Sequence, residues 1–184
     1  KNEQTGRINY PTYGFVCGVN YGKIISSKAL GKIVFDVSYE GNSMGSSDLY
    51  SSIATFVGEN SGEITECYSN ANIEGNIYDK YDSIMIGGFV GTNVGGDDAV
   101  ISKSAYDGKI DLTVDKNTCK MTIGGFVGSV NEGKIEHSLV AKEISVNCTK
   151  FEQDNYGWSA SRCRYGGFAG RNAGFVSDSY AVGI

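Results

Sequence analysis

The 184-residue chain contains one histidine, one proline and one tryptophan. A single histidine leaves only one participant for a histidine-rich zinc site or a catalytic triad, so the composition argues against both. The longest apolar runs are far shorter than the roughly 18 residues that a membrane-spanning helix needs. The 21 acidic residues outnumber the 16 basic ones, and the net charge of -5 has the wrong sign for a nucleic-acid partner.

Glycine and aromatic residues are abundant instead. The chain has 26 glycines, 12 tyrosines and 8 phenylalanines, and 40% of its residues are hydrophobic. This composition is too apolar for a disordered chain and is typical of one globular domain. The chain begins at Lys1 rather than at a methionine, so we expect a mature or excised piece of a longer protein.

A short string that contains Phe-Val-Gly or a close variant recurs five times. Its copies are residues 14–18, 54–58, 87–91, 124–128 and 166–170. An asparagine near a second glycine follows each copy, in the pairs Asn20/Gly22, Asn60/Gly62, Asn93/Gly95, Asn131/Gly133 and Asn172/Gly174. A β-branched residue then precedes a small one by three positions, as Ile101 precedes Ser104. In four copies an alternating run comes next, such as Ile110, Leu112 and Val114.

Alternation with period two is the pattern of a half-buried strand, and no segment shows helical periodicity. One repeat of about three short strands cannot enclose a core, whereas stacked repeats can. The sequence therefore predicts an all-β fold, a right-handed parallel β-helix (β-solenoid) of about five coils. We expect one domain over residues 1–184, with coils starting near 13, 53, 86, 123 and 165. Residues 1–12 form a partial coil or cap in this scheme, and the fifth coil is truncated.

Stacking places equivalent residues in columns. The inward aromatic column is predicted to contain Phe56, Phe89, Phe126 and Phe168, with Val16 in the first coil. The repeat also places Asn60, Asn93, Asn172, Gly58, Gly91, Gly128 and Gly170 at equivalent corners. We expect these corners to need a positive φ, which glycine and asparagine adopt most easily. Proline is scarce because it would remove a donor from the ladders between coils.

Insertions of variable length fall at one place in each coil, at residues 40–48, 78–82, 115–118 and 149–161. They are expected to project from one edge of the solenoid, and such an edge is often the binding surface of a repeat protein.

The combined string Gly-Gly-Phe-Val-Gly-x-Asn-x-Gly-x-Ile-x-x-Ser/Cys-Tyr, followed by Gly-x-Ile, resembles the GLUG repeat of large bacterial surface proteins. These include adhesins and the non-catalytic part of some immunoglobulin A peptidases. The resemblance covers the chain from about Tyr13 to Ile184, and the first copy departs from it by having Val16 in place of phenylalanine. It implies a secreted or cell-surface location in a bacterium and no defined ligand.

Motifs with possible chemistry have simpler explanations. Residues 41–45 fit the Gly-x-Ser-x-Gly pattern of a nucleophilic serine but lie in an inserted loop with no helix after it. Asp97 and Asp98 are expected to form a solvated turn rather than a calcium site, because no alternating Asp/Asn/Gly loop surrounds them. Asp36, Glu74, Asp111 and Ser145 form only a sparse acidic column. We therefore expect no catalytic residue, no metal and no cofactor.

The five cysteines align mostly with small core residues, which is the common role of a free cysteine. Cys17 aligns with Val57, Cys67 with the column serines, and Cys163 with Ile84. A disulfide between Cys148 and Cys163 remains open, since both flank the longest loop, and Cys119 is the cysteine most expected to stay unpaired.

The candidate ligand-binding residues are Tyr156, Trp158, Arg162 and Arg164, with Arg171 nearby. An exposed aromatic pair beside cations could stack on a sugar or hold an acidic group. The alternative is that Trp158 folds back and covers the end of the core.

The function predicted from these features is a non-catalytic extracellular repeat module that acts as an adhesion or spacer domain. Its expected partners are a host or matrix protein or glycan and the flanking domains of the parent chain, with no nucleic acid and no membrane embedding. One alternative is a carbohydrate-binding module that uses Tyr156 and Trp158. A solenoid enzyme that degrades polysaccharides is the other.

Overall fold

The computed structural model describes residues 12–39, 50–79, 83–114, 120–148 and 163–183. These residues form five parallel β-sheets, and the 3-10 turn η1 (Gly96–Asp98) is the one helical element in the described part. No helix in these ranges is long and apolar enough to cross a membrane.

Each pass of the chain contributes a short strand to each sheet in turn. The first coil has β1 (Thr12–Tyr13), β2 (Cys17–Asn20), β3 (Lys23–Ile25), β4 (Lys28–Ala29) and β5 (Lys32–Tyr39). The second has β6 (Tyr50–Ala54), β7 (Val57–Asn60), β8 (Glu63–Thr65), β9 (Tyr68–Ser69) and β10 (Asn72–Asp79). The third has β11 (Ser83–Gly87), β12 (Val90–Val94), β13 (Val100–Ser102), β14 (Ala105–Tyr106) and β15 (Ile110–Val114).

The last two coils repeat this order. The fourth has β16 (Lys120–Gly124), β17 (Val127–Asn131), β18 (Lys134–Glu136), β19 (Leu139–Val140) and β20 (Ile144–Cys148). The fifth has β21 (Arg164–Gly166), β22 (Ala169–Asn172), β23 (Phe175–Ser177) and β24 (Tyr180–Ala181). We name each sheet after its first-coil strand, so the β1 sheet contains β1, β6, β11, β16 and β21.

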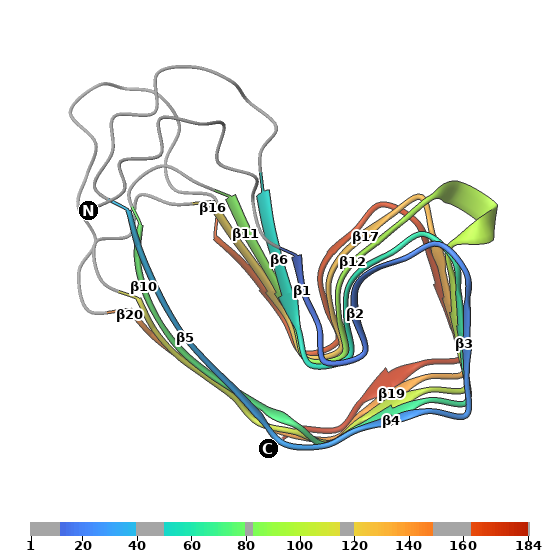
Figure 1. Cartoon of the computed structure of the whole chain (residues 1–184), viewed down its shortest axis with the longest axis horizontal. Coiled ribbons are helices and arrows are strands. Elements are labelled where there is room, and N and C mark those ends of the chain that lie inside the picture. The colour runs from blue at the N-terminus through green and yellow to red at the C-terminus, as the bar shows by residue number, and fades with distance from the viewer. Residues whose placement is uncertain (1–11, 40–49, 80–82, 115–119, 149–162, 184) are drawn as a thin grey trace.

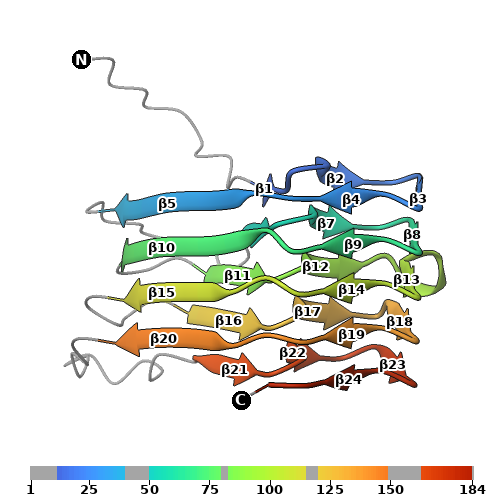
Figure 2. The same cartoon turned by 90° about the horizontal axis from the view of Figure 1, so that it is seen from below.

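The coils stack as a parallel β-solenoid, which confirms the predicted fold class (Figures 1 and 2). Taken together, the two views show a right-handed winding, with the N-terminal coil at one end of the stack and the C-terminal coil at the other. Four sheets contain five strands and the β5 sheet contains four, so the stack has fewer than five complete coils. The four predicted insertions all connect the last strand of one coil to the first strand of the next.

The full coils have five strands rather than the predicted three. The difference arises because each coil turns a corner just before the small residue that follows the β-branched residue by three positions, such as Ser104 after Ile101. The residue before that small residue has a left-handed backbone, with φ between 46° and 57°. This holds for Ser26, Glu66, Lys103, His137 and Asp178, all of which have exposed side chains. Since none of them is a glycine, the sequence contains no signal for the corner.

A ladder of serine and cysteine side chains supports this corner. The backbone N–H of Ser27 donates to Cys67 Sγ at 3.4 Å, and that of Cys67 donates to Ser104 Oγ at 3.2 Å. The N–H of Ser104 likewise donates to Ser138 Oγ, and the N–H of Ser138 donates to Ser179 Oγ. Each coil is thereby joined to the next through a small side chain. The predicted alignment of Cys67 with the column serines is confirmed, while the hydrogen bonds between coils were not predicted.

The core consists of columns of like residues. Phe56, Phe89, Phe126 and Phe168 stack with ring centroids 4.6, 4.9 and 5.0 Å apart and ring planes within 19° of parallel. Val16 takes the equivalent place in the first coil, where its N–H donates to the Phe56 carbonyl at 3.0 Å, but it is 40% exposed rather than buried. The predicted isoleucine columns are also in register, for example Ile73 beside Ile33 and Ile110. The predicted core is therefore confirmed in these columns.

The prediction about the corner glycines is wrong in its physical reason. Gly58, Gly91, Gly128 and Gly170 all have ordinary φ values, and in the described residues only Gly31, Gly95 and Gly96 are glycines with positive φ. A Cβ on Gly58 would lie 2.7 Å from the Gly18 carbonyl oxygen and 2.8 Å from Tyr13 N. These glycines are needed because a side chain would collide with the neighbouring coil and with the β1 sheet.

The column of glycines that contains Gly58 and Gly91 lies where the β1 and β2 sheets pack together. We call this contact between the two sheets the β1/β2 seam. Ser52 Oγ donates to the Gly58 carbonyl at 2.6 Å and lies 3.0 Å from Thr92 Oγ1. Thr92 Oγ1 also lies 3.3 Å from Met85 Sδ. Ser52 and Thr92 are buried, so the seam is a packed polar contact between two sheets.

We expect Gly91→Ala to lower the free energy of unfolding by about 1–3 kcal/mol, the usual cost of overpacking. The new methyl group would overlap Ser52 Oγ and lie 2.6 Å from the Gly58 carbonyl oxygen. Urea denaturation followed by circular dichroism measures the change. Gly22→Ala is the matched control, since its Cβ would meet nothing closer than Asn20 Oδ1 at 3.9 Å. Equal losses for the two variants would contradict the steric explanation.

Candidate functional site

The predicted binding residues are only partly placed by the structure. Tyr156, Trp158 and Arg162 lie outside the described residues. Arg164 begins β21 and is exposed, and Arg171 is exposed on β22. In the strand register they occupy the positions of buried Thr122 and Ser129 in the previous coil, at the end of the β1/β2 seam. The fold therefore brings two cations to the C-terminal end of one seam.

A ladder of buried asparagines crosses the first three coils. Asn20 Nδ2 donates to Asn60 Oδ1 at 2.8 Å, and Asn60 Nδ2 donates to Asn93 Oδ1 at 2.7 Å. Asn93 Nδ2 ends the series on the Ala99 carbonyl at 3.0 Å. The amide oxygens also accept backbone N–H groups from their own loops, as Asn20 Oδ1 does from Gly22 at 3.1 Å. These side chains hold the coils together and are not available to a ligand.

The fourth coil interrupts this ladder. Val130, not the predicted Asn131, pairs with Asn93 on one side and with Asn172 on the other. Val130 is completely buried, whereas Asn172 is exposed and its Oδ1 accepts Gly174 N–H at 3.0 Å. The spacing could have revealed this shift, because the ladder residue comes two positions after the column glycine and Asn131 comes three after Gly128.

We expect Asn60→Ala to lower the free energy of unfolding by about 2–4 kcal/mol, because it removes the 2.8 Å bond from Asn20 Nδ2 and the donor to the buried Asn93 Oδ1. Asn172→Ala is the control in the same loop position and should cost less than about 1 kcal/mol, since water can replace its contact. Thermal and urea unfolding of the two variants tests this difference. A loss at residue 60 no larger than that at residue 172 would refute a cooperative ladder.

Charged side chains form pairs between coils on the outer surface. Lys23 Nζ lies 2.7 Å from Glu63 Oε2, and Lys134 Nζ lies 2.7 Å from Asp97 Oδ1. The bond to Lys134 lowers the pKa of Asp97, whose carboxylate is thus already paired with a cation. Among the described residues no group of three His, Cys, Asp or Glu side chains is arranged to hold a metal ion.

The sparse acidic column that we noted in the sequence is not one column. Glu74 pairs in register with Val34 and Asp111, while Asp36 stands beside Asn76. Both carboxylates of the true column have a lysine partner, Lys32 at 2.5 Å from Glu74 and Lys109 at 3.1 Å from Asp111. A pair of free carboxylates for glycoside hydrolysis is therefore not assembled there.

The other motifs give no nucleophile in the described chain. Residues 41–45 lie outside it, and the side chain of His137 is solvent-exposed at a corner, 3.8 Å from Asp178. Cys17 and Cys67 are free thiols in core positions, and burial raises the pKa of both, which disfavours the reactive thiolate. The side chain of Cys148 lies outside the described residues, so the alternative of a disulfide with Cys163 is left open as in the sequence analysis.

One carboxylate that the sequence analysis did not single out lies near the seam. Glu59 is half-buried in β7, in register with Val19 and Thr92, and burial raises its pKa above the usual carboxyl range. The folded state therefore binds its proton more tightly than the unfolded chain does. The contribution of Glu59 to the free energy of unfolding is therefore most favourable below the pKa that its carboxyl has in the unfolded chain. It is lost as the pH rises through the pKa of the carboxyl in the folded state.

We expect Glu59→Gln to raise the free energy of unfolding at pH 7, with the gain disappearing below about pH 4, where the carboxyl is neutral in both states. Glu63→Gln is the control of opposite sign, because the bond to Lys23 lowers the pKa of Glu63. That variant should lose stability at pH 7 and approach the unmodified chain in acid. Urea unfolding over pH 3–8 measures both, and a loss of stability in Glu59→Gln at pH 7 would contradict the burial effect.

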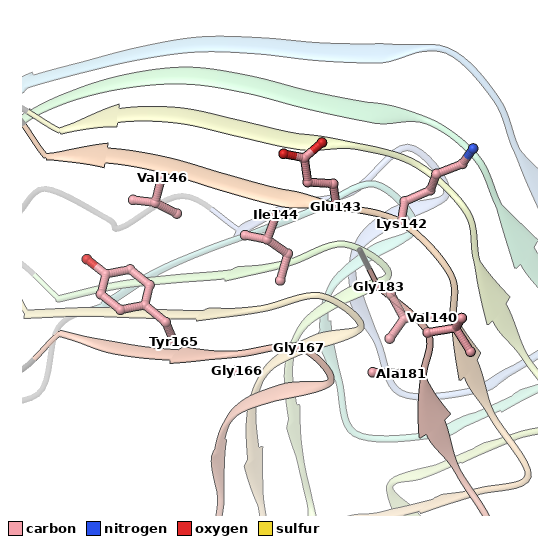
Figure 3. A pocket seen from close by; sticks show the side chains of 11 residues that line it. Val140, Lys142, Glu143, Ile144, Val146, Tyr165, Gly166, Gly167, Ala181 and Gly183 are labelled. Carbon is pink, nitrogen blue, oxygen red and sulfur yellow. The ribbon is translucent and has the colours of Figure 1, made fainter.

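An apolar pocket of about 510 Å³ lies at the C-terminal end of the stack. Ile144 and Val146 of β20 line one side, and Tyr165 of β21 lines the other (Figure 3). Lys142, Glu143, Ala181 and Val182 also line it. The sequence analysis did not identify this pocket, because the order of residues does not show which strands face β20.

Comparison with protein-family models, with curated proteins and with solved structures finds no match for this chain. The GLUG resemblance therefore rests on the repeated residues alone and stays a prediction.

Proposed function

We propose that the chain is a non-catalytic extracellular repeat module of a bacterial surface or secreted protein, acting as a spacer and adhesion domain. The main observation behind this proposal is that the interior side chains bind one coil to the next. The asparagine, serine/cysteine and phenylalanine columns all make contacts along the stack axis. Such a stack is a stiff support whose length depends on the number of coils.

The position of the insertions supports a role in adhesion. All four lie at the end of the fifth strand of one coil and before the first strand of the next, so most of the variable sequence falls at one connection of a regular scaffold. The smaller insertion η1 (Gly96–Asp98) lies at another corner, between β12 and β13. In repeat proteins, insertions on one face often supply the binding surface. A host or matrix protein or a glycan is the partner that fits an extracellular scaffold of this kind.

The experiment immobilises the chain on beads and measures their retention on surfaces coated with matrix proteins or glycans. We expect retention to fall at least about tenfold when Trp158 of the longest insertion, or Arg162 directly after it, is replaced by alanine, a typical loss for an interface anchor. Tyr21→Ala is the matched control, because this aromatic side chain is 79% exposed in the first coil, away from the insertions.

Two outcomes would count against the proposal. Equal retention by the Trp158→Ala and Tyr21→Ala beads would show that the longest insertion is not part of the binding surface. Retention on glycans alone, lost with Trp158→Ala, would support the proposal in its narrower form, a carbohydrate-binding module. Release of new chain ends from a polysaccharide, abolished by Glu74→Gln or Asp111→Asn, would show a solenoid enzyme.

A further inference from the structure

The β4 sheet forms a narrow face on the side of the solenoid, with two residues in each strand (Figure 2). In β4, β9, β14 and β19 the second residue is buried and the first points outward. The outward residues of the sheet form one column, which contains Lys28, Tyr68, Ala105, Leu139 and Tyr180. Tyr68, Ala105 and Leu139 belong to the second, third and fourth coils, so each of them has a described coil on both sides.

The ring of Tyr68 lies along this face. Its Cα is in register with that of Ala105, and its hydroxyl oxygen lies 3.5 Å from Oδ2 of Asp107, which is in the next coil. The side chain therefore crosses from its own coil to the next instead of extending straight into solvent. Ala105 is the smallest residue of the column and leaves space for the ring. A ring in this position has one face on the sheet and the other toward solvent, in agreement with the partial exposure of Tyr68.

Three polar side chains surround the hydroxyl end of this ring. Asn70 is exposed two residues after Tyr68, and Asp107 occupies the equivalent position in the next coil. Lys142 Nζ, from the coil after that, lies 3.7 Å from Asp107 Oδ1. These side chains place an amide, a carboxylate and an ammonium group next to one aromatic ring on the side of the stack.

The hydrogen-bonding capacity of these groups is largely unused. A carboxylate can accept about four hydrogen bonds, whereas Asp107 has two long contacts, 3.5 Å to Tyr68 and 3.7 Å to Lys142. The side chains of Asp107 and Lys142 are 41% and 55% exposed, so their ion pair contributes little to stability. The amide of Asn70 has no hydrogen-bond partner within the described part of the chain.

A flat apolar surface bordered by donors and acceptors suits a pyranose ring. The C–H groups on one face of the sugar can stack on an aromatic ring, and the hydroxyl groups at its edge can bond to polar side chains. Asp107 accepts such bonds, Lys142 donates them, and Asn70 does both. Because the charges of Asp107 and Lys142 compensate each other, the site favours a neutral sugar over a sugar acid.

We propose that the outward face of β9 and β14 binds a neutral pyranose unit of a glycan. The sugar stacks on the ring of Tyr68, and Asn70, Asp107 and Lys142 bind its hydroxyl groups. This inference rests on the adhesion role proposed above and names a glycan as the partner. It places the glycan site on the regular scaffold itself, separate from the insertions.

The test is a titration of the 184-residue chain with cellotriose, laminaritriose and chitotriose, followed by two-dimensional NMR. We expect at least one of these neutral sugars to shift the amide signals of Ala105 and Asp107 in a saturable way, with a Kd of about 0.1–10 mM. The amide of Ile64, in the β3 sheet, should not shift. Absence of a saturable shift with all three sugars would overturn the proposal, as would tighter binding of trigalacturonic acid.

Three variants separate stacking from other contributions. Tyr68→Ala should weaken binding at least about tenfold, whereas Tyr68→Phe keeps the ring and should bind within about threefold of the unmodified chain. Tyr180→Ala is the matched control, because this tyrosine of the same column is 60% exposed and has Val182 at the position equivalent to Asp107. Equal losses in Tyr68→Phe and Tyr68→Ala, with both spectra otherwise unchanged, would contradict stacking.

Bead retention separates this site from the insertions. On a surface coated with the sugar that binds in solution, retention should be lost in Tyr68→Ala and kept in Trp158→Ala. The reverse result would overturn this site and leave adhesion through the insertions in place. Sugar binding in solution by a chain that no coated surface retains would support the site and count against the adhesion role.

Discussion

The hydrogen bonds that run along the stack axis determine most of this structure. Phe56 N–H donates to the Phe89 carbonyl at 3.1 Å, and Phe89 and Phe126 continue the series to the next coils at 2.9 Å. Because these bonds hold the coils in register, equivalent residues of successive coils lie side by side and like side chains stack in columns. The aromatic stack, the asparagine ladder and the serine/cysteine ladder are all consequences of this one constraint.

The same constraint explains which parts of the fold could be predicted. Columns of like residues leave a repeated string in the sequence, so the registers of Phe89 and Ile101 followed from spacing alone. The left-handed corners left no such trace, because residues such as Lys103 adopt them without being glycine, and the strand count was underestimated. The role of Gly58 was also misjudged, since its requirement comes from the β1 sheet, which is distant in sequence and unknown until the coil is closed.

The candidate site was less predictable than the core for a related reason. Insertions differ from coil to coil, so no column fixes the places of Tyr156 and Trp158, and they lie outside the described residues. Asp36 was assigned to the wrong column because strands were aligned by chemical type instead of by counting from a fixed residue. The pocket beside β20 requires knowledge of what lies opposite, which the order of residues alone does not contain.

The left-handed corners have a consequence for how such a molecule can diversify. Five successive coils place serine, glutamate, lysine, histidine and aspartate at one backbone position, with every side chain in solvent. These residues form a line parallel to the axis with a spacing of about 4.8 Å, set by the strands themselves. Since packing of the core does not depend on which polar side chain is present at these positions, mutations can change the charges along this line one coil at a time. A rigid scaffold of this kind can therefore present many different electrostatic patterns from one unchanged fold.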